Sequence, residues 1–179
     1  MMSLVEVRQD EGGVLAQVAE LEAQLFPDLI EPNCLIAEKE RFLSTSKRNK
    51  IFACFTTSQE GRGDVRDVRN SGGFSSSDVT TEGAVVVGFL QCSFATSLAI
   101  SGLGVSPTAW RKGHATALLS HVISLARELK ISHASLYVST ASSPAISLYC
   151  TRFNFAVVDT IEGYYNNATD AHKLEATLE

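Results

Sequence analysis

The chain has 179 residues, of which 45% are hydrophobic, and this is enough to build one compact core of ordinary size. The net charge of -5 argues against a nucleic-acid-binding surface, because the few basic residues form no long patch. No apolar stretch approaches the roughly 20 residues of a membrane span, and no signal peptide follows Met1. The cysteines show no spacing typical of a disulfide framework or of a metal site; they are Cys34, Cys54, Cys92 and Cys150. We therefore expect one domain over residues 1–179, in a protein that is reduced, soluble and cytoplasmic.

The N-terminal part is predicted to form a short strand and two helices. Residues 4–8 are typical of a strand, and apolar residues at positions 14, 18, 21 and 25 have the spacing of one helical face, with Glu20 and Glu22 facing outward. This helix is expected to end at Phe26, because Pro27 disfavours helical geometry in the residue before it. A second helix is predicted over 35–43. The loop between the helices is unusually apolar, so either it packs onto the core or it forms a substrate-binding lip.

Two further strands are predicted over 51–55 and 84–94, and a hairpin ought to join them. The intervening segment 56–83 is instead rich in Ser, Gly, Thr, Asp and Arg. Such a composition cannot bury enough apolar surface to offset the entropy lost on ordering, so we expect a flexible insertion. Its role is either that of a tolerated surface loop or that of a regulatory or partner-binding segment.

The centre of the chain combines a strand, an irregular loop and a strongly amphipathic helix. The strand is predicted over 97–105, and Gly102 and Gly104 interrupt it, as glycines do at a bulge or a close backbone approach. The helix that follows has apolar residues at positions 115, 118, 119, 122, 126 and 129. Its first turn leaves about four N–H groups unpaired at an end with partial positive charge, beside Arg111, Lys112 and Gly113. This pattern predicts a seat for an anion, most naturally phosphate.

The segment Val105-x-Pro107-x-x-Trp110-x-x-Gly113-x-Ala115 resembles the acetyl-CoA-binding motif of the GNAT N-acetyltransferase superfamily. That motif is written as Gln or Arg, two residues, Gly, one residue, then Gly or Ala. Gly113 and Ala115 match it, whereas Trp110 replaces the leading residue. The resemblance implies an α/β fold of the GNAT type, a mixed and mostly antiparallel sheet flanked by helices, whose central parallel strands splay apart.

The resemblance also implies that acetyl-CoA is the co-substrate. In this family backbone N–H groups hold the pyrophosphate, and the pantetheine arm pairs with the strand before the motif. The positions that would contact acetyl-CoA are Leu103, Gly104, Val105, Arg111, Lys112, Gly113, His114, Ala115 and Thr116, together with Ser142 and Tyr149 farther along the chain.

A second GNAT-like element follows the next strand, which is predicted over 134–139 and parallel to the first, because a helix connects the two. Ser before Pro144 is a favourable helix start, with Ser as N-cap and Pro at the first helical position. The family's element reads Asn, two residues, Ala, Ile, one residue, an apolar residue and Tyr, then Gly-Phe. The matching residues are Ala145, Ile146, Leu148 and Tyr149. Ser142 replaces the Asn of the family's element. Asn154-Phe155 replaces Gly-Phe, with one extra residue between it and Tyr149. Asn is a tolerable replacement for Gly because it can adopt a left-handed turn.

Tyr149 is the first candidate for a catalytic residue. When a neutral amine attacks the thioester, coenzyme A leaves as a thiolate, and a phenol with a reference pKa of about 10 is a suitable proton donor to it. Members of the superfamily often have a Tyr here in that role. The alternative is a half-buried helix aromatic with no chemistry. Cys150 has no evident histidine partner, so direct transfer is preferred to a covalent acyl-enzyme.

The C-terminal part resembles the final hairpin of N-terminal (Nα) acetyltransferases that act on Met-starting peptides. A strand is predicted over 155–158, and Tyr164-Tyr165 then precedes a polar turn and a last apolar strand. In that branch the Tyr pair lies over the peptide N-terminus and a Phe-Pro loop lies opposite, which implies substrate binding by Phe26, Pro27, Tyr164 and Tyr165. The alternative is a hairpin with two aromatic cross-strand residues.

The group that deprotonates the acceptor is less well defined by the sequence. The branch often uses a His on the strand after the motif, and this chain has Tyr137 at that position. The branch also often uses a Tyr on the strand before the motif, which would fall near Ala99 or Ile100 and is missing here. A free α-amino group has a pKa of about 8 and is partly neutral already, so Tyr137 is a hypothesis for a water-positioning group. The four histidines make no metal set, and no metal is expected.

The sequence thus predicts transfer of acetyl from acetyl-CoA to the α-amino group of a peptide or protein N-terminus. Two alternatives stay open. One is acetylation of a lysine side chain or a small-molecule amine. The other is a CoA-binding subunit without activity, which stays open because Trp110 and Ser142 depart from the family's motifs and the Tyr near Ala99 is missing. An auxiliary subunit or the ribosome is a further candidate partner, and no direct nucleic-acid or membrane partner is expected.

Overall fold

The computed structural model describes residues 3–8, 11–27, 32–57, 84–165 and 169–179, with the backbone alone for 32–36 and 57. Most of the predicted insertion, 58–83, lies outside the described residues, whereas its first two positions belong to a strand. Among the described residues, no helix is long and apolar enough to cross a membrane.

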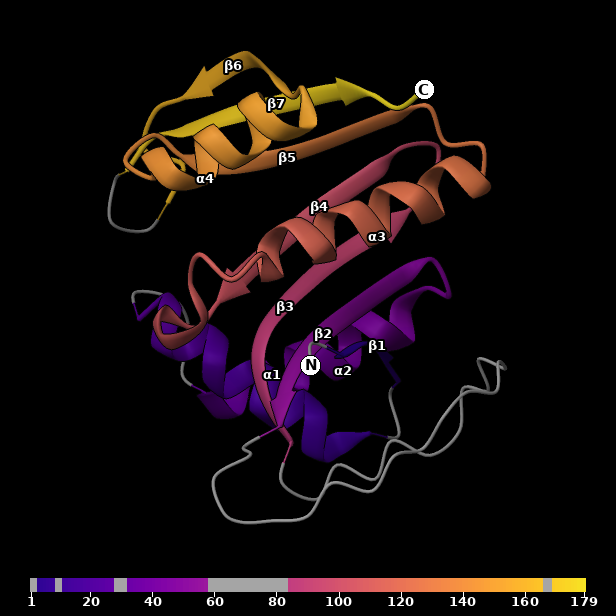
Figure 1. Cartoon of the computed structure of the whole chain (residues 1–179), viewed down its shortest axis with the longest axis vertical. Coiled ribbons are helices and arrows are strands. Elements are labelled where there is room, and N and C mark those ends of the chain that lie inside the picture. Colours follow the sequence, from indigo (N-terminus) through magenta and orange to yellow (C-terminus); the bar gives the residue numbers. More distant parts are fainter. Residues whose placement is uncertain (1–2, 9–10, 28–31, 58–83, 166–168) are drawn as a thin grey trace, which may run out of the picture.

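The described chain contains seven strands and six helical segments (Figure 1). In chain order they are β1 (Ser3–Val7), α1 (Gly12–Leu25), α2 (Pro32–Thr45), β2 (Asn49–Thr57), β3 (Ala84–Phe94), β4 (Leu98–Val105), the 3-10 turn η1 (Pro107–Ala109), α3 (His114–Glu128), β5 (His133–Ser139), α4 (Ser143–Ser147), the π-helix η2 (Leu148–Arg152), β6 (Ala156–Ile161) and β7 (Ala171–Thr177).

The strands form one sheet in the order β1-β2-β3-β4-β5-β7-β6. The β4–β5 pair is parallel and the other five pairs are antiparallel. This arrangement confirms the prediction of a mixed, mostly antiparallel sheet flanked by helices.

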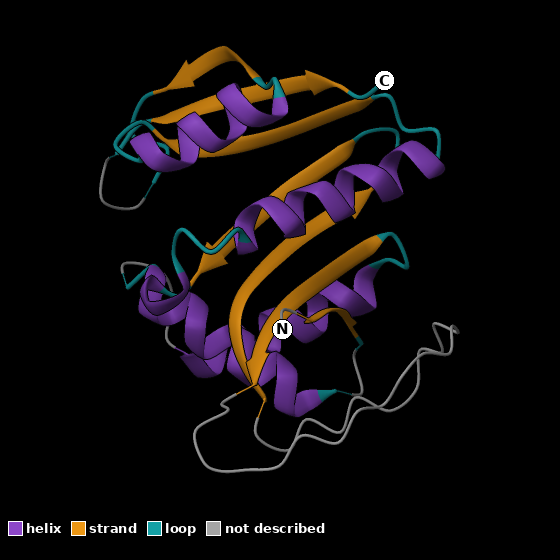
Figure 2. Ribbon diagram, viewed as in Figure 1, coloured by secondary structure: helices purple, strands orange, loops and turns teal. Residues whose placement is uncertain are grey.

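The helices cover opposite faces of the sheet (Figure 2). Neighbouring residues of β3 belong to different apolar clusters, since successive strand side chains point to opposite faces. Phe89 packs with Leu15 and Val18 of α1, and Leu90 packs with Leu118 of α3. The sheet therefore has a core on each side, with α1 on one face and α3 on the other.

Several helix boundaries differ from the sequence predictions, and α2 covers Pro32–Thr45 where a helix over 35–43 was expected. Helix α3 ends at Glu128 because Lys130 has φ 59°, a left-handed conformation that stops the helix, so Leu129 is 60% exposed instead of buried. Helix α4 begins at Ser143 with Ser142 at the N-cap, one residue earlier than predicted, and no side-chain capping hydrogen bond is made.

The parallel pair separates after three residues. Pairing of β4 with β5 runs only from Leu98↔Ala134 to Ile100↔Leu136, after which β4 continues beside β3 and β5 continues beside β7. The register of β3 and β4 also shifts between Gln91 and Cys92, near the glycines that predicted an irregularity. Figure 1 shows the two strands diverging toward their carboxyl ends. Among the described residues, the segment of β4 after Ile100 therefore has an edge without a strand partner, at the opening between the two halves of the sheet.

Candidate active site

The N-terminus of α3 lies beside this opening and has a glycine N-cap. Its N-cap, Gly113, has φ 87° and ψ 1°, a left-handed conformation that glycine adopts without steric cost. No side chain caps the helix, and its first turn holds no acidic residue. The N–H groups of His114, Ala115 and Thr116 precede the first intrahelical hydrogen bond, which Ala117 N donates to Gly113 O over 2.9 Å. Backbone donors and the helix dipole are thus available to a phosphate.

The basic residues of this loop have different surroundings. Lys112 Nζ donates to the carbonyl oxygen of Thr108 over 2.9 Å, so this cation is directed back onto the loop. Arg111 is exposed and has φ 62°. His114 is buried, and burial, together with the nearby Lys112, lowers its pKa below the usual value. The imidazole is therefore neutral at pH 7, and Arg111 and Lys112 supply the positive charge.

Trp110, which replaces the Gln or Arg of the motif, keeps a side-chain donor. Its Nε1 donates to the carbonyl oxygen of Val105 over 2.7 Å, while the side chain stays 59% exposed. This hydrogen bond joins the loop to the end of β4 and fixes the indole next to the anion seat.

The end of α1 packs closely against β4 at Gly104. A Cβ added there would lie 2.7 Å from both Leu25 Cδ1 and Phe89 Cε1, so only glycine fits without movement of its neighbours. Phe26 and Pro27 follow directly, and both are exposed. The predicted lip thus begins beside the β4 opening, while its continuation over 28–31 lies outside the described residues.

Tyr149 lies in the π-helix and is 6% exposed, with its ring edge-to-face against Phe155 at 5.9 Å. The extra residue that the sequence shows before Asn154-Phe155 coincides with this π-helix, which accommodates one additional residue in a turn. Asn154 then takes the left-handed conformation, with φ 55°. Burial, together with Tyr165, raises the pKa of Tyr149 well above its usual value, so its hydroxyl keeps its proton at neutral pH.

The four tyrosines of the chain come together at one place. Tyr137 on β5 stacks on Tyr164, with ring centroids 4.9 Å apart, and Tyr164 meets Tyr165 edge-to-face at 5.0 Å. Tyr165 in turn is close enough to Tyr149 to affect its pKa. The main chain between β6 and β7 is held by Gly163 N donating to Asp170 Oδ1 over 2.9 Å and Tyr165 N donating to Thr169 O over 3.1 Å. The fold thus joins the predicted catalytic residues to the predicted peptide-binding pair.

A buried ion pair was missed by the sequence analysis. Lys39 Nζ of α2 lies 2.7 Å from Glu22 Oε2 of α1, and it donates to Gln91 Oε1 of β3 over 2.6 Å. The prediction that Glu22 faces outward is wrong, since this residue is 9% exposed. Helical spacing could not reveal the pair, because the partner comes from the following helix.

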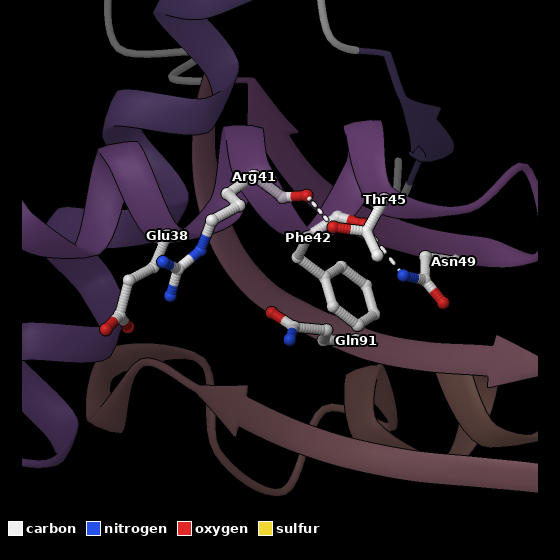
Figure 3. Close-up of a pocket in the computed structure, with 6 residues that line it drawn as sticks. All are labelled: Glu38, Arg41, Phe42, Thr45, Asn49 and Gln91. Atoms are coloured by element: carbon white, nitrogen blue, oxygen red, sulfur yellow. Dashed lines mark hydrogen bonds between the residues drawn. The ribbon is translucent and has the colours of Figure 1, made fainter.

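A separate depression lies between α2 and the strands β2 and β3 (Figure 3). Its lining residues are Glu38, Arg41, Phe42, Thr45, Asn49 and Gln91, and none of the predicted site residues is among them. Three of its polar side chains are used within the chain. Thr45 Oγ1 donates to Arg41 O, Asn49 Nδ2 donates to Phe42 O, and Gln91 Oε1 accepts from Lys39 Nζ. It is not part of the anion seat. Within the described segments, no group of three or more His, Cys, Asp or Glu side chains could hold a metal ion.

A splayed parallel pair, an uncapped helix with a glycine N-cap beside it and a protonated tyrosine at the opening define a class of acyl-CoA-binding transferases. The model of the acetyltransferase (GNAT) family matches residues 31–155, and the chain belongs to this family. It is accordingly an acetyl-CoA-dependent N-acetyltransferase. No curated protein sequence matches it.

Several solved structures are similar to this one. Arabidopsis thaliana NAA60 in complex with a bisubstrate analogue has a TM-score of 0.71 at 18% identity, with 100% of each chain covered. Arabidopsis thaliana Naa50 in complex with the bisubstrate analogue CoA-Ac-MVNAL has a TM-score of 0.66 at 21% identity, covering 98% of this chain and 97% of that one. Nourseothricin acetyltransferase has a TM-score of 0.54 at 18% identity, covering 74% and 66%. At these identities the likeness establishes the shared fold.

Proposed function

We propose that this protein transfers acetyl from acetyl-CoA to the α-amino group of a peptide or protein N-terminus. The observation that carries the proposal is the meeting of Tyr137, Tyr164 and Tyr165 beside Tyr149, at the opening between β4 and β5. The similarity to Naa50, solved with an analogue that joins CoA to a Met-starting peptide, supports the same acceptor class. The whole of 1–179 acts as one acetyltransferase domain in this proposal.

Acetyl-CoA would bind along the opening and the α3 N-terminus. The unpaired edge of β4 suits an amide-containing arm, and the N–H groups of the first α3 turn suit a pyrophosphate. The residues assigned to this site are Leu103, Gly104, Val105, Arg111, Lys112, Gly113, His114, Ala115, Thr116, Ser142 and Tyr149.

The reaction proceeds by direct attack. The neutral amine forms a C–N bond with the thioester carbonyl carbon, the nitrogen loses one proton to solvent, the C–S bond breaks, and the sulfur leaves as a thiolate. Tyr149 donates its hydroxyl proton to that thiolate and later regains one from solvent. Phe26, Pro27, Tyr164 and Tyr165 hold the first residues of the acceptor.

Substitution of Tyr137 by Phe tests its assignment as a water-positioning group. The ring and its stacking on Tyr164 are kept, and only the hydroxyl is lost. We expect kcat/KM for a peptide to fall about tenfold, less than for loss of a direct proton donor, with the Kd of acetyl-CoA unchanged. Steady-state kinetics at pH 7 measures this, and unchanged activity would remove Tyr137 from the mechanism.

Trp110 offers a direct test of the acetyl-CoA site, because the chain holds no other tryptophan. Its indole is exposed and fixed next to the anion seat by the bond to Val105 O. We expect saturable change in its fluorescence on titration with acetyl-CoA, and none with acetate. A constant emission, while calorimetry reports acetyl-CoA binding, would place the ligand elsewhere.

The acceptor class is tested by coenzyme A release with peptides whose N-termini are Met-Leu, Ser or Ala, beside polyamines and an internal-lysine peptide. Turnover on one class of free N-terminus is expected, and turnover on lysine or polyamine alone would contradict the proposal. An auxiliary subunit or ribosome and a cytoplasmic location remain predictions, which copurification and fractionation would test.

A further inference from the structure

The buried pair Glu22–Lys39 takes no part in the reaction as described so far. Glu22 is 9% and Lys39 5% exposed, and Lys39 Nζ lies 2.7 Å from Glu22 Oε2, 2.6 Å from Gln91 Oε1 and 5.6 Å from the Phe89 ring centroid. Two buried charges seldom stabilise a fold more than apolar residues of the same size would. Their presence at this place therefore invites a functional reason.

The pair lies beneath the part of β4 that has left β5. Glu22 Oε1 is 3.8 Å from the position that a Cβ on Gly102 would occupy, and Gly102 follows the last β4–β5 pair by two residues. A side chain at 102 would come into van der Waals contact with the carboxylate. One turn farther along α1, Leu25 contacts Gly104, so the whole end of α1 lies against this segment of β4.

The two carboxylate oxygens of Glu22 have different surroundings. Oε2 is fully buried, lies 2.7 Å from Lys39 Nζ and has no hydrogen-bond partner among the described residues. Oε1 is the oxygen that lies 3.8 Å from the position of a Cβ on Gly102. The charge of Lys39 thus holds the carboxylate at Oε2, while Oε1 lies toward the β4 segment at Gly102.

The other groups packed around Glu22 bring little charge. From β3 the neighbour is the neutral Gln91, and β4 has no charged residue over Leu98–Val105. On α2, Glu38 and Arg41 line the depression on the side of Gln91, as Figure 3 shows. Lys39 is therefore the one charge in direct contact with Glu22 among the described residues.

We propose that Glu22 holds the acceptor ammonium group, through a bound water, and takes up its proton before the attack. The ammonium loses one proton to the carboxylate by way of this water, the nitrogen lone pair then forms the C–N bond, and Glu22 returns the proton to solvent. Lys39 is a positioning residue, since it acts through Glu22. This inference rests on the proposed amine-acetylating function.

The test compares Glu22→Gln with the wild-type chain over pH 6.5 to about 9.5, a range that spans the acceptor amine pKa of about 8. We expect an unchanged Kd for acetyl-CoA and a kcat/KM for the peptide lowered by about 10²-fold at pH 7. The deficit should shrink as the pH rises, because the acceptor then becomes neutral without help. Glu20→Gln, two residues away on the exposed face of α1, is the matched control and should keep wild-type activity at every pH.

Because Glu22→Gln leaves Lys39 buried without its partner, Glu22→Gln/Lys39→Met removes both charges and should fold stably. The same pH-dependent deficit in this double variant would support the inference. Full activity, or a deficit equal at every pH in the folded double variant, would overturn it. If the wild-type enzyme acetylates only lysine or small amines, the proposed function fails, and the same comparison with that amine decides the role of Glu22 separately.

Discussion

Replacement of Tyr149 by Phe is expected to lower kcat by about 10²–10³-fold, because it removes the proposed proton donor to the leaving thiolate. The ring remains and keeps its edge-to-face contact with Phe155, so the melting temperature should change little. The Kd of acetyl-CoA should also stay within about twofold, since the phenyl ring still lines the site. Stopped-flow and steady-state assays of coenzyme A release measure the effect.

The raised pKa of Tyr149 also sets the pH dependence expected for kcat. Burial raises the pKa of Tyr149, so the hydroxyl loses its proton only at a higher pH than an ordinary phenol with a pKa of about 10. As the acid form persists, kcat of the wild-type enzyme should show no fall caused by Tyr149 up to about pH 9.5. An unchanged kcat in the Phe variant, with acetyl-CoA bound normally, would exclude Tyr149 as the acid.

Replacement of Thr116 by Asp is expected to weaken acetyl-CoA binding by about 10²-fold. Thr116 lies in the first turn of α3, where a carboxylate is favourable to the helix dipole but repels a bound pyrophosphate. At an effective dielectric of about 20, two unit charges 4–5 Å apart repel by roughly 3–4 kcal/mol before screening. The helix should therefore be no less stable while its ligand is lost.

Thr116→Asn is the matched control, since it has nearly the same shape as Asp without the charge. We expect its Kd for acetyl-CoA to lie much closer to that of the wild-type enzyme, and the Asp defect to lessen at high salt. Calorimetric titration, together with thermal unfolding, checks both statements. Equal affinities of the Asp and Asn variants would mean that phosphate does not bind at this helix end.

The sequence was most informative where a pattern is local. Helical periodicity located α3 and its core face, and the glycines at 102 and 104 pointed to the irregular strand that leads to the opening. The helix start at Gly113 could be predicted because its determinants, a glycine before an amphipathic helix and adjacent basic residues, are contiguous. The parallel direction of β4 and β5 could also be predicted, because a helical crossover between two neighbouring strands makes them parallel.

The remaining features arise from contacts between distant segments. Glu22 was expected on the outer face because its burial depends on Lys39 of another helix. The stacking of Tyr137 on Tyr164 depends on the way β5 and the β6–β7 connection meet, which neither segment specifies alone. Leu129 fits the apolar period of α3, yet the helix has already ended there. The spacing revealed one extra residue after Tyr149, but it could not predict that a π-helix accommodates this residue.

The central claim is that the acceptor is an N-terminal amine. The most direct measurement compares one Met-Leu peptide containing an internal lysine in two forms, with a free and with a chemically blocked α-amine. Mass spectrometry after incubation with acetyl-CoA locates the new acetyl group. We predict acetylation of the free N-terminus and no turnover on the blocked peptide. Acetyl-lysine on the blocked peptide, formed at a comparable rate, would contradict the account.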